Sequence, residues 1–336
     1  MDSARVHTYR RSMPPGRAAS TACVVLAGLA ALWLGCSEQT TPPRAIVVIS
    51  LDTLRADHLG CYGYARPTSP NIDALAAEGV LFERAISQAS STLPAHRALF
   101  QSREASLAGG AEPTLAELLG RAGFRTVAFT GGGNVSAAFG FGRGFERYVE
   151  DPRGFAHAFD AVELWLREHA GERFFLFLHS YDVHAPYDPP PPFDSVFYPD
   201  YAGPLTGRET RALLRSLAPR GEHASSAPAR RLDEEDERKL VALYDGGILY
   251  ADQFVGRLVL LLRELGIDDE TALVLLSDHG EEFWEHGSVL HSHSLYQELV
   301  HVPLIFSLPG GRAAGARVAE TVRLIDVAPT LLELLG

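Results

Sequence analysis

The stretch Ala45–Asp52, AIVVISLD, is an apolar and mostly β-branched run, interrupted only by Ser50, that ends in an aspartate. The run shows no alternation of polar and apolar residues. This is typical of a strand that is buried on both faces within a parallel sheet. The stretch therefore predicts a central strand at the start of the folded body.

The order of strand, loop and helix recurs along the rest of the chain. Residues 114–132, TLAELLGRAGFRTVAFTGG, read as a helix, a glycine turn and a strand. Such alternation predicts an α/β fold with helices packed around a mostly parallel sheet. The 336-residue length allows one large domain at 45–336. Residues 189–238, rich in proline, serine and charge, predict an excursion over the surface.

The N-terminal residues resemble an export signal. Basic residues precede a short apolar run and then small residues, which is the order of a secretory signal. The box LWLGC predicts a lipoprotein-type signal peptide at 1–36 that starts at Met1 or Met13 and is lipidated at Cys36. A plain membrane anchor is the alternative, because an apolar run of about 17 residues is just long enough to span a bilayer. Residues 37–44 would then be a linker.

The predicted export signal indicates where the protein is expected to act but not what it binds. We expect the protein in the cell envelope (periplasm or outer membrane), held to the membrane by its lipid or N-terminal segment. The formal net charge is −12, and residues 1–36 are net positive, so the remainder is more acidic still. An acidic body argues against non-specific binding to nucleic acid or anionic lipid. The three cysteines have no metal-type spacing and imply no disulfide framework.

Polar residues follow the predicted strands at their carboxyl ends, where open α/β sheets bind ligands. Asp52 follows the first strand, and ALVLLSDHGE ends in Asp278 and His279. Carboxylates with an imidazole suit a divalent cation. FFLFLHSYDVH runs into Asp182 and His184, although an aspartate at such a place is usually a turn former or helix cap.

Five of the 13 histidines fall within 23 residues, and this clustering favours a site in which one or two of them contact a ligand: His279, His286, His291, His293 and His301.

Thr92 lies two residues before Pro94 in the stretch STLPAHRALF. Proline is favoured in the first turn of a helix, so the Thr92 hydroxyl is expected near the positive end of a helix. A metal ion would acidify it further and make it a nucleophile. The alternative is that Thr92 only caps the helix.

Three long blocks, in this order, resemble the sulfatase family of the alkaline phosphatase superfamily, from about Ala45 to Gly336. They are VVISLDTLRADHLGCYGYARPTSPNIDALAAEGVLFERAISQASSTLPAHRALF, ILYADQFVGRLVLLLRELGIDDETALVLLSDHGEEFWEHG with LYQELVHVPLIF, and LIDVAPTLLELLG. The resemblance implies an alkaline-phosphatase-like three-layer sandwich with a mostly parallel central sheet, with the family's C-terminal subdomain apparently missing.

The resemblance also implies site residues. One divalent cation would be held by Asp52, Thr92, Asp278 and His279. Thr53 stands where the family has a second leading aspartate. His184 matches a histidine that contacts the transferred group, and His291 falls where the family has lysine or histidine. With His96, these histidines would steady the non-bridging oxygens or protonate the leaving group.

Thr92 occupies the register of the cysteine or serine that sulfatases oxidise to formylglycine. Oxidised threonine would be a ketone, so no formylglycine is expected. Thr92 with Asp278 and His279 instead resembles superfamily members with a phospho-threonine intermediate. The loop QSREASLAGGAEPT also lacks the family's basic pair.

The sequence thus predicts a metal-dependent hydrolase of sulfate or phosphate esters that acts through a covalent Thr92 ester. The substrate would be a small-molecule, glycan or lipid ester. The cation would be calcium, or zinc or manganese because histidine is a ligand. A phosphoethanolamine-transferase-like enzyme and a catalytically silent binding lipoprotein are the alternatives.

Overall fold

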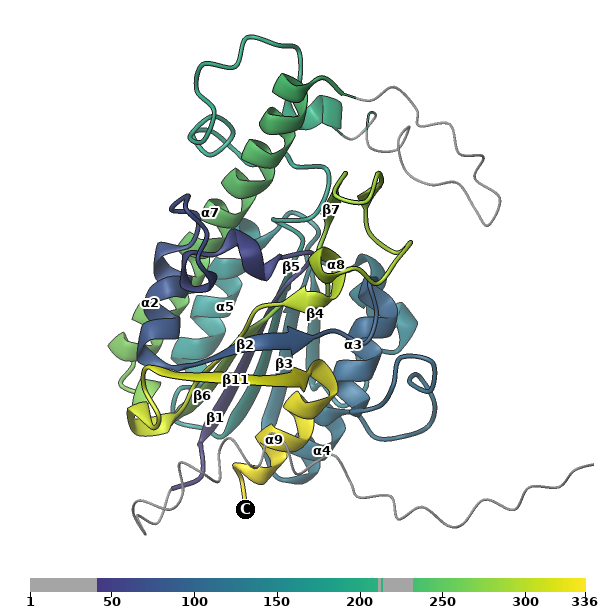
Figure 1. Ribbon diagram of the computed structural model, residues 1–336. Coiled ribbons are helices and arrows are strands. Elements are labelled where there is room, and N and C mark those ends of the chain that lie inside the picture. Colours follow the sequence, from purple (N-terminus) through teal and green to yellow (C-terminus); the bar gives the residue numbers. More distant parts are fainter. Residues whose placement is uncertain (1–40, 211–212, 214–231) are drawn as a thin grey trace, which may run out of the picture.

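A computed structural model describes residues 41–210, 213 and 232–336 (Figure 1). The predicted signal peptide with Cys36, and residues 37–40 of the predicted linker, lie outside the described residues. Within the described ranges, no helix is long and apolar enough to cross a membrane.

Nine strands form the central sheet in the order β11-β2-β10-β6-β1-β5-β3-β4, with β9 paired to β2. The sheet is parallel except that β10 runs antiparallel to both of its neighbours and β9 runs antiparallel to β2. The strands are β1 (Ala45–Leu51), β2 (Val80–Ile86), β3 (Arg125–Thr130), β4 (Arg147–Glu150), β5 (Phe174–Ser180), β6 (Thr271–Leu276), β9 (His301–Val302), β10 (Leu304–Ser307) and β11 (Ala316–Arg323). A separate hairpin pairs β7 (Glu282–Phe283) with β8 (Val289–Leu290).

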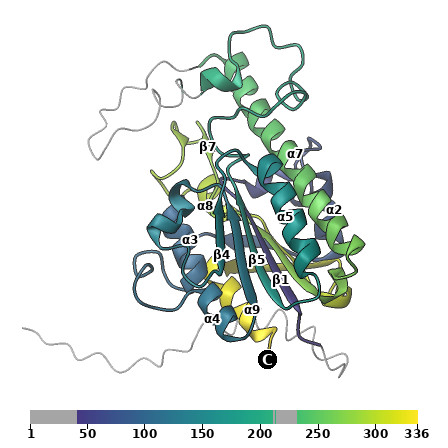
Figure 2. The same ribbon diagram turned by 180° about the vertical axis from the view of Figure 1, so that it is seen from behind.

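Helices cover both faces of the sheet, because successive side chains of a strand point to opposite sides. On β1, Val47 and Ile49 pack into one core and Ile46 and Val48 into the other. The first core is closed by α2 (Pro70–Glu78), α5 (Phe155–His169) and α7 (Glu234–Glu264), of which α5 and α7 lie side by side in Figure 2. The second is closed by α3 (Thr92–Gln101), α4 (Leu115–Arg121) and α9 (Val327–Glu333). The predicted α/β three-layer fold is confirmed.

Helix α7 begins inside the stretch that the sequence predicts as a surface excursion. Residues 189–206 are turns and irregular backbone, but the charged run at the end of the predicted excursion is helical from Glu234. The Asp233 side chain accepts a hydrogen bond from the Asp236 backbone, and acidic residues fill the first turn. Carboxylates stabilise the positive end of a helix, so this charge marks a helix start as well as a surface.

A buried carboxylate on α7 holds the loop that follows β1. Asp245 is fully buried, and its oxygens lie 2.7 Å from His58 Nδ1, the Tyr64 hydroxyl and Arg66 Nη1. Each partner comes from the segment just after Asp52. The hydrogen bonds therefore fix the segment that carries Asp52 relative to the helix layer.

Asp245→Ala should lower the free energy of unfolding by about 3 kcal/mol, because it leaves buried His58 and the half-buried Tyr64 and Arg66 without their shared acceptor. Urea denaturation of the purified protein measures this change. Glu163→Gln is the control, since Glu163 pairs with Arg167 on the surface of α5 and its loss should cost less than about 0.5 kcal/mol. Equal effects of the two substitutions would contradict a structural role for Asp245.

Candidate functional site

Four side chains predicted from the sequence converge at the carboxyl ends of two neighbouring strands. Asp52 directly follows β1, and Asp278 and His279 follow β6, which pairs with β1 in parallel. One ligand atom from each of these three residues lies within 4.8 Å of the others. Thr92, the first residue of α3, places Oγ1 3.3 Å from His279 Nε2. All four side chains are buried.

His279 presents a bare ring nitrogen to this cluster. Its Nδ1 lies 2.9 Å from the Gly280 carbonyl and donates to it, which leaves Nε2 unprotonated in the neutral ring. Burial, followed by the nearby His291, lowers the pKa of His279 to about 4, so the ring is neutral near pH 7. Nε2 lies 3.4 Å from Asp278 Oδ2 and 3.9 Å from Asp52 Oδ1. A histidine held in this way is oriented as a metal ligand.

The two carboxylates each keep one oxygen without a partner. Asp52 Oδ1 and Asp278 Oδ2 are buried and accept no hydrogen bond from any described residue. Burial, and then the charge of Asp52, raises the pKa of Asp278 well above its usual value. Burial also acts to raise the pKa of Asp52, but the His179 hydrogen bond and the neighbouring histidines outweigh it and lower that pKa.

Two buried carboxylates this close cannot both ionise unless a positive charge is present. The orphaned oxygens, the bare imidazole nitrogen and the Thr92 hydroxyl form a donor set that suits a divalent cation. The residues at this site therefore fit the metal that the sequence predicts.

Thr53 does not take over the role of a second aspartate. It has a left-handed φ of 60° and donates its hydroxyl to the Asp52 carbonyl at 2.7 Å. A β-branched residue rarely adopts this conformation, and such strain concentrates at functional sites. The Thr53 amide points to Asp278 Oδ1 at 3.4 Å, and its carbonyl accepts from the Tyr244 hydroxyl. Thr53 thus shapes the turn and contributes no ligand atom of its own side chain.

The structure places His96 differently from the predicted contact with the transferred group. Its Nδ1 donates to the Thr92 carbonyl at 3.0 Å, and its Nε2 accepts from the Ser50 hydroxyl at 3.0 Å. Burial, and then His179, lowers the pKa of His96 to about 3, so the ring is neutral. With both nitrogens bonded and no exposure, His96 fastens the start of α3 to β1.

His184 and His291 lie next to the cluster and are more exposed than its four members. Their ring centroids are 5.0 Å apart, and the His291 ring is 4.5 Å from that of His279. His184 Nδ1 bonds to the Ala185 carbonyl, and His291 Nδ1 lies 2.8 Å from Glu281 Oε1. Each ring therefore has its Nε2 left for a ligand.

The other clustered histidines have structural partners. His286 pairs with Glu298 at 3.1 Å, His293 with Glu282 at 2.6 Å, and His301 Nε2 donates to a β2 carbonyl. Of the five, only His279 and His291 belong to the site.

Sequence reasoning missed His179 and Glu281. His179 Nε2 donates to Asp52 Oδ2 at 3.2 Å from the end of β5. The signal is a histidine that continues a row of alternate buried phenylalanines, Phe175 and Phe177, at a strand end.

Asp182, by contrast, accepts from the Phe155 amide at 2.9 Å. Asp182 therefore caps the start of α5, in agreement with the alternative that an aspartate at such a place is a helix cap.

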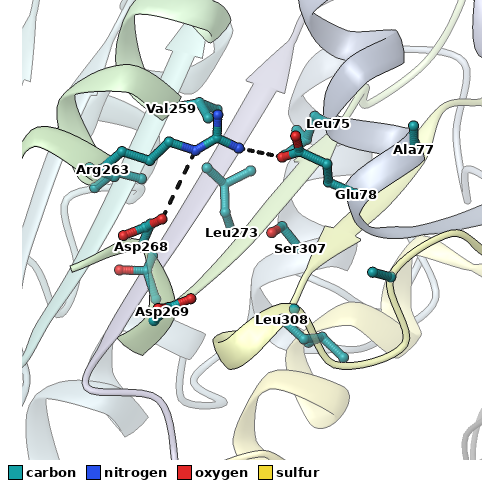
Figure 3. Close-up of a pocket in the computed structure, with 14 residues that line it drawn as sticks. Leu75, Ala77, Glu78, Val259, Arg263, Asp268, Asp269, Leu273, Ser307 and Leu308 are labelled. Atoms are coloured by element: carbon teal, nitrogen blue, oxygen red, sulfur yellow. Dashed lines mark hydrogen bonds and ion pairs between the residues drawn. The ribbon is translucent and has the colours of Figure 1, made fainter. Parts of the chain in front are cut away.

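A cavity of about 380 Å³ lies at the opposite end of β6 and shares no residue with the site. Figure 3 shows Arg263 at its edge, between Glu78 and Asp268. Thr271 and Leu273, at the start of β6, line it. It is therefore separate from the chemistry at the carboxyl end of the strand.

Asp278→Asn should abolish metal-induced stabilisation while sparing the metal-free fold. The raised pKa of Asp278 means that folded protein binds its proton more tightly than unfolded protein does. That stability is present at low pH and is lost as pH rises above about 4 through the folded pKa. The lowered pKa of Asp52 acts only below this window.

The melting temperature of the metal-free variant should therefore rise relative to wild type between pH 4 and pH 8. With the cation at 100 times its Kd, wild type should gain about 2.7 kcal/mol and the variant none. Differential scanning fluorimetry with EDTA, calcium, zinc or manganese measures both. Equal metal responses in the two proteins would contradict the ligand assignment.

Known proteins are similar to parts of this chain in sequence. Arylsulfatase K of Bos taurus is 33% identical over 106 residues, which are 32% of this chain and 19% of that protein. The multifunctional alkaline phosphatase superfamily protein PehA of Trinickia caryophylli is 29% identical over 185 residues, 51% of this chain and 36% of that protein. The chain thus matches about a fifth to a third of these relatives' lengths.

Solved structures share the fold. The phosphonate monoester hydrolase of Agrobacterium radiobacter superposes with a TM-score of 0.71 at 22% identity, covering 88% of this chain and 74% of that one. The periplasmic domain of EptC from Escherichia coli, solved with zinc, gives a TM-score of 0.66 at 18% identity over 88% and 83% of the chains. The sequence profile of the Sulfatase family matches residues 44–336, and the chain belongs to that family.

Proposed function

We propose that the protein is a metal-dependent hydrolase of sulfate or phosphate esters in which Thr92 is the nucleophile and forms a covalent ester. The observation that carries the proposal is the position of the buried Thr92 hydroxyl, 3.3 Å from His279 Nε2. That nitrogen lies 3.4 Å and 3.9 Å from the orphaned oxygens of Asp278 and Asp52. A threonine that served only as a cap would not need this donor set at its hydroxyl.

The protein's own residues prepare the nucleophile. Thr92 is the first residue of α3, where the positive end of the helix favours an ionised oxygen. His96 donates to the Thr92 carbonyl and so fixes the backbone from which the hydroxyl projects. A divalent cation held by Asp52, Thr92, Asp278 and His279 would lower the pKa of the hydroxyl and neutralise negative charge on the transferred group.

His184 and His291 are placed to receive the substrate. Their Nε2 atoms are the free ring nitrogens on the open side of the cluster. In the doubly protonated form each ring would donate from Nε2, and these hydrogen bonds would stabilise the non-bridging oxygens or the leaving oxygen as charge develops. Water then hydrolyses the Thr92 ester and restores the hydroxyl.

Two observations bear on the class of ester, and they favour different classes. Family membership favours sulfate esters, while a threonine nucleophile favours phosphorus, because it cannot become formylglycine. A histidine ligand favours zinc or manganese over calcium. The fold shared with a phosphonate monoester hydrolase fits either class of ester. We expect the protein to act in the cell envelope, because its N-terminal residues resemble an export signal.

Transfer to an alcohol is the second candidate function. The fold shared with the periplasmic domain of the phosphoethanolamine transferase EptC from Campylobacter jejuni favours it. Hydrolysis and transfer share the Thr92 ester and differ only in whether water or an alcohol accepts the group.

Thr92→Ala should abolish turnover and leave the metal-free melting temperature nearly unchanged, because the hydroxyl bonds only to His279 Nε2. Thr92→Ser is the matched control and should keep measurable turnover, since it restores a hydroxyl. Rates on the best aryl ester, measured with each metal, provide the comparison. Full activity in Thr92→Ala would remove Thr92 from the nucleophile role.

A substrate panel separates the candidate functions. Aryl sulfates, phosphate monoesters, phosphate diesters and phosphonate monoesters are each assayed with calcium, zinc or manganese. We expect metal-dependent release of the phenol and a covalent adduct on Thr92 in quenched samples by mass spectrometry. Product analysis with added ethanolamine or glycerol then distinguishes hydrolysis from transfer. A protein that binds metal and turns over no ester would instead be a binding lipoprotein.

A further inference from the structure

A buried carboxylate next to the metal ligands has no role in the proposed function so far. The Glu281 side chain is fully buried, and Oε1 lies 2.8 Å from His291 Nδ1. Its other oxygen and the buried Tyr187 hydroxyl have no hydrogen bond of ordinary geometry within the described chain. Burying an ionised glutamate costs free energy unless the carboxylate is paired or hydrogen-bonded. The hydrogen-bonded partner of Glu281 is His291.

The backbone of Glu281 is fixed. The Gly280 amide bonds to the Leu299 carbonyl at 2.8 Å, and the Glu281 amide bonds to the Glu298 carbonyl at 3.1 Å. Glu281 follows His279 by two residues, so one rigid turn carries both a predicted metal ligand and the partner of His291.

The backbone around His291 is held in an unusual conformation. Leu290 and Ser292, on either side of it, have left-handed φ values of 68° and 75°. Non-glycine residues adopt this region rarely, and pairs of such residues mark places where the fold dictates a side-chain position. The Ser292 amide also bonds to the carbonyl of Ser90, two residues before Thr92. The loop that carries His291 is thereby tied to the turn that carries the nucleophile.

The two ring nitrogens of His291 have different roles in this geometry. Nδ1 is committed to Glu281, so Nε2 is the atom that remains for a substrate. The ring lies among the site's other imidazoles, 4.5 Å from His279 and 5.0 Å from His184 between centroids. A carboxylate that fixes the tautomer and orientation of an imidazole in this way is the arrangement used in proton transfer.

We propose that Glu281 is a positioning residue that holds His291 so that its Nε2 carries protons in both halves of the reaction. This inference rests on the proposed function. His291 begins doubly protonated, with Nδ1–H donating to Glu281 and a second proton on Nε2. In the first half, ionised Thr92 Oγ bonds to phosphorus or sulfur, the bond to the leaving oxygen breaks, and the Nε2 proton passes to that oxygen, which leaves His291 neutral. In the second half, Nε2 takes a proton from the attacking water as the bond to Thr92 Oγ breaks. Both residues then return to their starting forms.

The next residue supplies a matched control. Glu282 is equally buried, and its Oε2 pairs with His293 Nε2 at 2.6 Å. His293 is as exposed as His291, at 18% against 16% of the side chain. Glu282 also accepts from the His286 and Ser288 amides, so it stabilises the loop without touching the site.

The test compares Glu281→Gln with Glu282→Gln on aryl esters whose phenols differ in acidity, using the metal-loaded protein. Proton donation matters most when the leaving group is a poor one. Glu281→Gln should therefore lose about 10²-fold in kcat/KM on the phenyl ester and only a few-fold on the 4-nitrophenyl ester. Glu282→Gln should lower both rates equally or not at all. His291→Ala should match the Glu281→Gln pattern, and the double variant should be no worse than His291→Ala.

Three outcomes would overturn the inference: an equal loss across the whole ester series in Glu281→Gln, the same selective loss in Glu282→Gln, or fully additive losses in the double variant. Nitrogen-15 NMR of the histidine rings gives a readout independent of turnover. The His291 Nδ1–H signal should be present in wild type and in Glu282→Gln, and shifted or lost in Glu281→Gln. If wild type hydrolyses none of the esters, the proposed function fails, while an unchanged His291 signal in Glu281→Gln separately defeats the positioning role.

Discussion

Two carboxylates buried side by side are the constraint around which the site is built. Asp52 and Asp278 stand at the ends of adjacent parallel strands, and each keeps an oxygen without a hydrogen bond. Like charges in a dry interior repel strongly, so one carboxylate holds a proton unless a cation replaces it. The fold imposes this unfavourable arrangement, because the register of β1 and β6 fixes where both side chains emerge.

The contacts around Asp52 and Asp278 are consistent with two carboxylates buried close together. His179 bonds to one oxygen of Asp52 and leaves the other free, while the Gly280 carbonyl sets the tautomer of His279. The strained turn at Thr53 directs an amide toward Asp278. The start of α3 adds the Thr92 hydroxyl to the same point. Together these contacts leave Asp52 Oδ1 and Asp278 Oδ2 without a hydrogen bond within the described chain, and unpaired buried oxygens of this kind suit a cation.

The sequence predicts the fold and the metal set because both depend on local patterns. An unbroken apolar run followed by aspartate signals a buried strand and a strand-end ligand, and this reasoning found Asp52, Asp278 and His279. The role of His96 was not predictable in the same way, since its partners Ser50 and the Thr92 carbonyl are set by how α3 packs on β1.

His179 and Glu281 were not predicted as site residues, and the reason is physical in both cases. His179 lies inside an apolar strand and differs from its neighbours only by chemistry, so hydrophobic periodicity assigns it to the core. Glu281 and Glu282 are adjacent and identical in type, and only the course of the loop decides that one faces His291 and the other His293. The start of α7 was placed too late because its acidic first turn has the composition of a solvated loop.

The separation of the two aspartates along the chain has a consequence for folding. Asp52 and Asp278 belong to the first and sixth strands, so no fragment that stops before β6 contains a complete set of ligands. An ion bound between them would act as a reversible cross-link across most of the polypeptide, and closing so long a loop restricts the unfolded chain considerably. Capture of an ion here would then follow the pairing of β6 with β1, and loss of the ion would remove a cross-link between the carboxyl ends of these two strands.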